Sequence, residues 1–319
     1  MHWSLSRRYC QTVRLRSSSV WLALFVVLSS PPAIASPHLR IDFFDVGQGD
    51  AALITSPTGK TVLIDGGPPE AQHRLVARLR ARLSHGRPLD LVLLTHRHLD
   101  HLGGIALVID DVGTQLYLDP AFEHPTPAYA KLVAELAAHH VPVRDAHAGR
   151  QIDLGGGAVL TLLGPPSPPL THTRSDVNAN SIVARLDYGH VRVLFAADME
   201  PQTERWLLAK DQSALRADVI KVPHHGGHYS STAALVRAVA SPGPGGRHLS
   251  LAVVSVGAHN DYHHPSDVVI RRWEQAGARV HRTDRDGELA LRTDGERIDV
   301  LPGAIVAAPT TTTGAVVPP

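Results

Sequence analysis

The sequence feature that most constrains the fold is a dense polar motif behind a short apolar run. Three histidines and one aspartate stand within six residues: His96, His98, Asp100 and His101. The preceding run, Leu89–Leu94, has the length and bounds of a buried strand. A loop this short cannot keep four polar groups apart, and neutral imidazoles with a carboxylate suit zinc, manganese or iron. The pattern therefore favours a metal site over a solvated, histidine-rich loop.

Both ends of the chain differ in composition from its middle. Four arginines precede the apolar stretch Val20–Leu28, which is followed by a small-x-small sequence. This order predicts a secretory signal peptide over residues 1–35, because the stretch is too short to span a bilayer comfortably; a retained N-terminal anchor is the alternative. Residues 304–319, uncharged and rich in proline and threonine, predict a disordered tail. We expect one domain over residues 36–303.

Cysteine content and charge narrow the classes of ligand and partner. The one cysteine, Cys10, lies within the predicted signal peptide, so a metal site in the rest of the chain depends on His, Asp or Glu. Loss of the leader's four arginines lowers the formal net charge from +1 by four. The domain therefore lacks the basic field that draws in nucleic acid. We interpret Arg74, Arg78 and Arg82, on one face of a predicted helix, as solvated rather than as a phosphate-binding stripe.

The order of the predicted elements indicates two sheets. Early strands are predicted over residues 39–45, 51–55 and 60–64, and later ones, which alternate with helices, over residues 181–186, 191–196, 218–222 and 251–256. That order favours two sheets with helices packed outside them in one domain. The polar clusters sit just past predicted strand ends, where loops on a rigid scaffold usually carry sites.

Six polar motifs follow one another in a specific order. They are Asp45–Asp50, Thr95–Gly104, Asn178–Ser181, Ala197–Asp198, Lys221–Gly226 and Asn260–Pro265. Together they resemble the metallo-β-lactamase-fold domain of the ComEC type, the hydrolase module attached to DNA-uptake channels, over about residues 39–300. No segment here resembles the polytopic channel part. The resemblance implies a mixed α/β (α+β) protein, an αββα four-layer sandwich with two divalent metal ions, zinc or manganese, at the sheet edges.

The resemblance also assigns ligands to the two ions. His96 and His98 would hold the first ion, Asp100 and His101 the second, and Asp198 would bridge them. A histidine of the pair His224-His225 would complete the second ion. The Pro-x-His-Gly placement favours His225, which leaves His224 to contact substrate.

One part of the family pattern is missing. The family supplies a third histidine to the first ion, and here that place contains Asn178, Asn180 and Ser181 instead. His172 is nearby but off the pattern. We therefore expect a first ion that is weakly held, bound only with substrate, or manganese rather than zinc.

Several other motif residues receive supporting roles. Asp45 and Asp50 are expected to fix the orientation of ligand histidines, with a simple tight turn as the alternative. Asn180 and Ser181 are expected beside the ligands or the substrate. Lys221 is expected either to meet a phosphate oxygen or to be solvated.

Two residues are candidates for proton transfer. Asp100 is a candidate for a combined role as ligand and orienting base. His264, which precedes Pro265, is a candidate proton donor to the leaving group, although a plain loop histidine is an equal alternative.

The ligand set predicts hydrolysis by a metal-activated water, most plausibly of a phosphodiester and with DNA as a candidate substrate, outside the cytoplasm in the periplasm or medium. The negative charge argues against tight, nonspecific DNA binding. One alternative is hydrolysis of another ester, of the phosphocholine type, or of a lactam. Another is a non-catalytic metal-binding module with a degenerate first site. No protein partner is predictable, and no stable membrane span is expected after signal cleavage.

Overall fold

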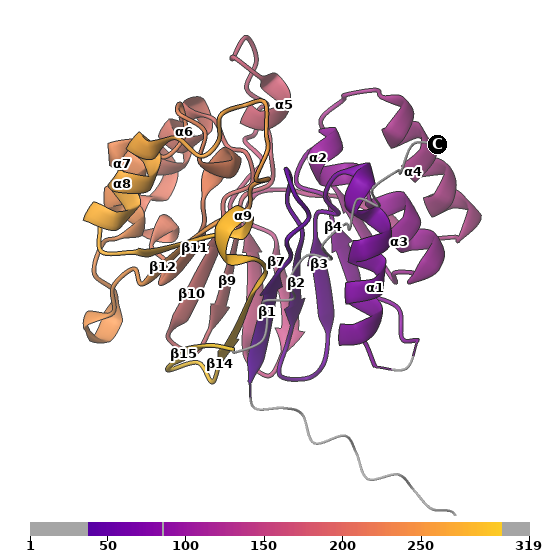
Figure 1. The fold of residues 1–319 in the computed structure, drawn as a ribbon, viewed down its shortest axis with the longest axis horizontal. Coiled ribbons are helices and arrows are strands. Elements are labelled where there is room, and N and C mark those ends of the chain that lie inside the picture. The colour runs from indigo at the N-terminus through magenta and orange to yellow at the C-terminus, as the bar shows by residue number, and fades with distance from the viewer. Residues whose placement is uncertain (1–37, 85, 302–319) are drawn as a thin grey trace, which may run out of the picture. The chain divides into compact units, whose positions relative to one another are not determined.

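The computed structural model describes residues 38–84 and 86–301; the predicted signal peptide and tail lie outside them. Two sheets face each other in the middle of this part of the chain (Figure 1). The first sheet has the order β15 (Ile298–Val300), β14 (Leu289–Thr293), β1 (Leu39–Phe43), β2 (Ala52–Thr55), β3 (Thr61–Ile64), β4 (Leu91–Leu93), β5 (Tyr117–Asp119) and β6 (Val143–Asp145). The second has the order β13 (Arg279–Arg282), β12 (Leu251–Val254), β11 (Val219–Lys221), β10 (Val191–Phe195), β9 (Ala184–Tyr188), β8 (Ala158–Leu162) and β7 (Gln151–Gly155).

Helices cover the outer face of each sheet (Figure 1). The first sheet is covered by α1 (Gln72–Arg82), α3 (Ile105–Asp111) and α4 (Pro127–Ala138), and the second by α6 (Pro201–Asp211), α7 (Ala233–Val239) and α8 (Asp267–Gln275). The shorter pieces are α2 (Leu99–Leu102), α5 (Asp176–Ala179), α9 (Thr283–Asp286) and 3-10 turns at Pro69–Ala71, Gln212–Leu215, Pro223–Gly226 and Pro244–Gly246. This arrangement confirms the predicted αββα sandwich.

Strands in the middle of each sheet are buried on both faces. Ile54 faces the core between the sheets, while its neighbour Leu53 packs against the helices outside. Phe43 of the first sheet stacks on Phe195 of the second, with ring centroids 5.9 Å apart. Double burial explains why these strands are continuous apolar runs in the sequence rather than alternating ones.

Elements without such a run escaped the sequence prediction. Strand β6 (Val143, Arg144 and Asp145) is exposed along its whole length. It is an edge strand that carries charges, as edges commonly do. The predicted strand over residues 181–186 begins at Ala184 instead, and Ile182 N donates to the carbonyl of Thr95 in the motif loop. Short helices such as α2 and α5 have no room for helical periodicity.

Strand direction brings the motifs to one edge. Strands β3, β4 and β5 run parallel in the first sheet, as do β10, β11 and β12 in the second. Carboxyl ends of parallel strands meet at the same edge, where α/β proteins usually bind ligands. The segment α2 follows β4 there, and α5 lies at the same end of the sandwich, at the top of Figure 1. None of the described helices has the length and apolar character needed to cross a membrane.

Candidate metal centre

The motif loop is held close to the turn that follows β1. Asp50 N donates to the carbonyl of Asp100 at 3.2 Å. Gly49 lies so near that a Cβ atom there would be 2.2 Å from the same carbonyl oxygen. Its φ of +147° is also one that other residues rarely adopt. The glycine of this turn is therefore required for close backbone approach to the metal loop.

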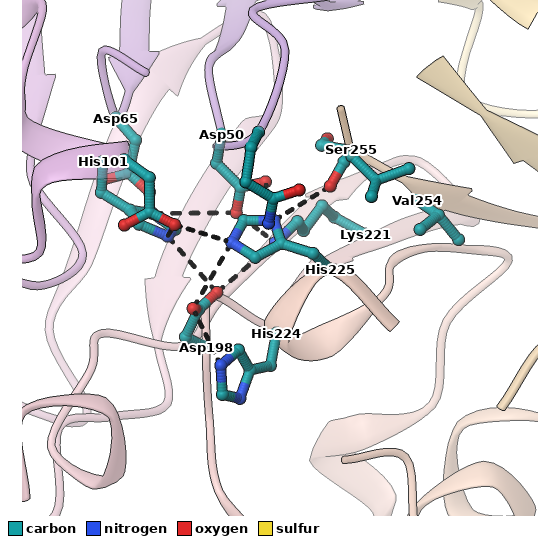
Figure 2. A network of polar contacts seen from close by, with 12 residues as sticks. Asp50, Asp65, His101, Asp198, Lys221, His224, His225, Val254 and Ser255 are labelled. Atoms are coloured by element: carbon teal, nitrogen blue, oxygen red, sulfur yellow. Dashed lines mark hydrogen bonds and ion pairs between the residues drawn. The ribbon is translucent and has the colours of Figure 1, made fainter. Parts of the chain in front are cut away.

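Asp198, just beyond β10, lies among histidines from both sheets (Figure 2). Its Oδ1 is 3.4 Å from Nε2 of His101, and its Oδ2 is 3.5 Å from Nε2 of His225. One ligand atom from each of Asp100, His101, Asp198 and His225 can be chosen so that all lie within 4.8 Å of one another. Such spacing allows the four groups to share one ion. We call these four residues the assembled half of the centre.

The far nitrogens of the two histidines in the assembled half are already engaged. Nδ1 of His101 lies 2.8 Å from Oδ2 of Asp65, and Nδ1 of His225 donates to the carbonyl of Ser255 at 2.9 Å (Figure 2). These contacts orient each ring so that Nε2 faces Asp198, as is usual for metal-binding histidines. Sequence reasoning missed Asp65. Its signal was its position at the end of β3, the strand beside β4.

His96 and His98, which we call the histidine half, are less closely gathered. Nε2 of His96 is 3.9 Å from Oδ2 of Asp198 and has no hydrogen-bond partner among the described residues. Within residues 38–84 and 86–301, no set of three or more metal-ligating side chains that meets the 4.8 Å spacing includes His96 or His98. The two rings pack edge to face, with centroids 4.8 Å apart.

Arg97, between the two histidines, anchors this half to the first sheet. Its guanidinium donates to Asp119 at 2.6 Å and lies 3.8 Å from the ring centroid of Tyr129. The hydroxyls of Tyr117 and Tyr129 also donate to Asp119. The loop is therefore held by β5 and α4, on the side away from Asp198.

The pKa values of the histidines are shifted in opposite directions in the two halves. Burial alone would lower the pKa of His101, but the carboxylates of Asp198 and Asp100 outweigh it and raise that pKa well above its ordinary value. Asp198 and Asp50 do the same for His225. The buried carboxylates thus require positive charge, which divalent cations supply when they displace the imidazole protons.

The histidine half behaves in the opposite way. Burial lowers the pKa of His96 well below its ordinary value, with the charge of His101 adding to the effect, and burial also lowers the pKa of His98. Both rings are therefore neutral near pH 7. A neutral imidazole offers a nitrogen lone pair, which is the form that binds a metal.

Lys221 is not solvated, and its ammonium group does not line the open cavity that lies over the centre. It is 4% exposed and forms a buried ion pair with Asp50, and its Nζ is 3.9 Å from Oδ1 of Asp198 (Figure 2). Burial alone would raise the pKa of Asp50, but the charges of Lys221, His225 and His101 together outweigh it and hold that pKa below its ordinary value. The pair supports the assembled half from behind, which corrects the expectation of a phosphate contact.

His224 points toward Asp198 from the other side. Its Nε2 is 3.8 Å from Oδ2 of Asp198, and its Nδ1 is 3.5 Å from the buried carboxylate of Glu200. Both His224 and His225 have positive φ, at 49° and 52°. Left-handed backbone at two successive non-glycine residues is strained, and such strain is common at functional sites. The two rings thus take separate positions, with His225 in the assembled half.

An open cavity of about 480 Å³ lies over the centre. Its lining is Gln48, Pro68, Pro69, Glu70, His98, Leu99, Asp100, Asn178, Asp198, His224, His225, Tyr262 and His264. The cavity is large enough for a small organic substrate. Both halves of the centre contribute to its lining, so a bound substrate would meet them together.

His264 reaches this cavity from the loop after β12. Asn260 brackets it by bonding its backbone N and O, and the ring of Tyr262 stacks on it at 5.7 Å. Burial, and then the charges of His225 and His224, lower the pKa of His264 to about 4. A group with that pKa is neutral at pH 7, so it is suited to accept a proton rather than to deliver one to a leaving group.

Other predicted residues lie outside the cavity lining. Asp45 accepts a hydrogen bond from Gly47 N at 3.1 Å, as expected for a tight turn. The carboxamide of Asn180 is hydrogen-bonded to backbone atoms of Leu170 and Asp176, and Ser181 is fully buried. His172 is exposed, in the loop before α5.

The residues present fit a pair of divalent ions. Four buried polar atoms around Asp198 have no hydrogen-bond partner among the described residues: Asp50 Oδ1, His96 Nε2, His101 Nε2 and Asp198 Oδ1. Buried polar groups are almost always paired, so such a cluster needs an explanation. Imidazole and carboxylate groups are a common donor set for zinc and manganese.

Comparison with known proteins places this geometry in a family. The sequence model described as the metallo-beta-lactamase superfamily matches residues 44–244. The chain is 24% identical over 270 residues to ComE operon protein 3 of Bacillus subtilis (strain 168), and 27% identical over 276 residues to competence protein ComA of Neisseria gonorrhoeae. These matches cover 79% and 86% of this chain but 33% and 35% of the relatives. The chain thus spans about a third of the length of these curated relatives.

Solved structures agree on the fold. CmlA, a diiron beta-hydroxylase from Streptomyces venezuelae, superposes with a TM-score of 0.51 at 16% identity, over 80% of this chain and 54% of that one. The metallo-beta-lactamase fold protein YhfI from Bacillus subtilis matches 77% of this chain and 95% of its own, with a TM-score of 0.48 and 14% identity. At 16% identity the likeness to CmlA concerns the fold alone.

Proposed function

Because this chain belongs to the metallo-β-lactamase superfamily, we propose that it is a metal-dependent phosphodiesterase, with DNA among its substrates. The observation that carries the proposal is the position of Asp198, which lies within 4 Å of His96, His101 and His225 beneath an open cavity. A single carboxylate between histidines of both halves is what a two-ion centre requires.

The chain's own residues would hold the ions in the two halves already described. Asp100, His101 and His225 would hold one, His96 and His98 the other, and Asp198 would contact both. Divalent cations bound there would act as Lewis acids, which lower the pKa of a coordinated water and offset the charge that develops on phosphoryl oxygens. His224, oriented by Glu200 and lining the cavity, would contact a substrate oxygen. The neutral ring of His264, which also lines the cavity, would accept a proton.

Exposed side chains at and near the cavity are evidence for a substrate that carries nucleic-acid bases. Tyr262, which is 67% exposed, lines the cavity, and Arg174 lies 4.2 Å from the ring centroid of Tyr229, which is 60% exposed. The charge of Arg174 reaches His264, where it contributes to the lowered pKa. Exposed aromatic rings and a guanidinium are the groups on which nucleic-acid bases stack. The ComEC resemblance, supported by the match to a competence protein, points to the same substrate.

Export to the periplasm or medium is part of the proposal. It depends on the predicted signal peptide of residues 1–35. Expression of the full chain, followed by cell fractionation and N-terminal sequencing, tests it. We expect an exported chain that begins at Ser36, and an uncleaved chain retained in the cell would contradict the proposal.

The activity is tested with the full chain, reconstituted with zinc or manganese. The substrates are single-stranded DNA, bis-p-nitrophenyl phosphate and nitrocefin. We expect hydrolysis of the two phosphodiesters and none of nitrocefin. His98→Ala and Asp198→Ala should each lower turnover by about 10³-fold or more, because several kcal/mol of transition-state stabilisation is lost with an ion. Asp110→Ala, on α3 and away from the cavity, is the matched carboxylate control.

Other results would replace the proposal. Preferred turnover of nitrocefin would indicate a lactam hydrolase. One bound ion or none, without turnover of any ester, would indicate a non-catalytic metal-binding module with a degenerate first site. Retained turnover in both His98→Ala and Asp198→Ala would overturn the site itself.

A further inference from the structure

Within the described residues, no third histidine joins His96 and His98 in the histidine half. His172, the histidine nearest in sequence to the expected place, is exposed, and its backbone N is bonded to Asp176. His224 is oriented toward Asp198 and Glu200, and no set of ligating atoms at 4.8 Å spacing within the described residues joins it to His96 or His98. Another donor is needed to complete this half.

Two asparagines of the same short segment have opposite environments. Asn180 accepts from Leu170 N at 2.8 Å and donates to the carbonyls of Leu170 and Asp176, both at 2.7 Å. Its carboxamide is therefore fully used within the loop. Asn178, two residues earlier on α5, is 3% exposed, and its Oδ1 has no hydrogen-bond partner among the described residues.

Asn178 is part of the cavity lining, together with His98, Asp198 and His224. The backbone holds it there: Ser175 Oγ accepts from Asn178 N at 3.3 Å, and Asn178 O accepts from Ser181 N at 3.1 Å. Thr203 of α6 fixes the next residue by donating to the carbonyl of Ala179 at 2.6 Å. The position of Asn178 thus follows from contacts that do not use its side chain.

Buried polar groups are almost always paired, so a buried carboxamide oxygen without a partner needs an explanation. The cavity lining includes three carboxylic acids but no lysine or arginine that could pair with this oxygen. A cation remains as the partner that suits both the amide oxygen and the surrounding carboxylates.

We propose that Oδ1 of Asn178 is the third protein ligand of the ion held by His96 and His98, with Asp198 shared between the two ions. This inference rests on the two-ion centre of the proposed function. The resulting set of two imidazoles and two oxygens is harder than the usual set with three histidines. It therefore shifts the preference of this half from zinc toward manganese.

The test is metal binding by the metal-free full chain, titrated separately with MnCl₂ and ZnSO₄ and followed by calorimetry and by electron paramagnetic resonance of free manganese. The wild type should bind two Mn²⁺ ions. Asn178→Ala should bind one of them unchanged and the other at least about 10–100-fold more weakly. Asn178→His should raise the zinc-to-manganese affinity ratio of the weaker site. Tyr262→Phe, a cavity-lining control, should match the wild type.

The outcomes distinguish this inference from the proposed function. If the wild type binds fewer than two ions, the two-ion centre itself is wrong. If the wild type binds two and Asn178→Ala binds both with unchanged affinity, only the role of Asn178 is wrong. Circular dichroism checks the fold of each variant. If Asn178→Ala does not fold, the ratio of zinc affinity to manganese affinity at the weaker site of Asn178→His tests the inference instead. A ratio equal to that of the wild type would overturn the inference.

Discussion

The two halves of the metal centre come from one loop but are built differently. Asp100 and His101 join Asp198 and His225 from the second sheet, and Asp65, Ser255 and the buried pair Asp50–Lys221 support them from behind. His96 and His98 have neutral, less closely gathered rings, and Arg97 between them forms an ion pair with Asp119. The difference indicates that a motif sets which ligands are available, whereas the surrounding contacts set how each ligand is oriented.

The largest expected effect tests the support behind the assembled half. Lys221→Met should lower the free energy of unfolding by about 3–5 kcal/mol, because Asp50 then stays buried without its cation. Urea unfolding of the metal-free chain measures it. Lys60→Met, at an exposed lysine, is the control and should change stability by less than about 0.5 kcal/mol.

A double variant makes this test specific to the Asp50–Lys221 ion pair. Asp50→Leu combined with Lys221→Met removes both charges, so it should recover part of the loss. Equal small losses in Lys221→Met and Lys60→Met would mean that the buried pair does not support the centre.

A smaller effect is expected on metal retention, which should differ between the assembled half and the histidine half. After dialysis against metal-free buffer, we expect the wild type and His98→Ala to keep one ion per chain and His225→Ala to keep none. The reason is that the tightly gathered ligands belong to the assembled half, and loss of one should weaken its ion at least about 10–100-fold. Elemental analysis of the dialysed protein provides the measurement, with exposed His263→Ala as the control. If His98→Ala lost its ion and His225→Ala kept one, the order of the two halves would be reversed.

The smallest effect concerns the anchor of the histidine half. Burial, and then the charge of Asp119, raise the pKa of Tyr129 to about 12. A raised pKa stabilises the fold below the ordinary tyrosine value of about 10, and that contribution is lost as pH rises through the folded value. Absorbance at 295 nm, wild type minus Tyr129→Phe, should therefore show a transition near pH 12. A difference transition near pH 10 would show that the phenol is not held by Asp119.

The sequence predicted the parts of the centre that are local. His96, His98, Asp100 and His101 stand out because their spacing is confined to one loop behind an apolar run. Asp198 and the pair His224-His225, each just after a strand, were assigned through the family resemblance. The arginines of α1 were interpreted as solvated, but Arg78 and Arg82 lie near Glu288, and Arg82 also contacts Asp42. These ion pairs join a helix to residues that are distant in the sequence, so no local sequence pattern could predict them.

Residues whose role depends on long-range contacts were missed or misjudged. Asp65 acquires its role because β3 pairs with β4, and Lys221 acquires its role because the two sheets bring it to Asp50. Asn178 and Asn180 are two residues apart and of the same type. The structure separates them, since Asn180 is fully bonded and the carboxamide oxygen of Asn178 has no partner among the described residues.

The sequence by itself determined which metal-ligating groups are available, imidazoles and carboxylates, and placed them at strand ends behind short apolar runs. Only the tertiary structure decided which of those groups meet, which nitrogen each ring presents and which carboxylates are paired with a cation. The physical reason is the range of the interactions. Strand and helix formation depend on neighbours in the chain, whereas burial and charge pairing depend on neighbours in space.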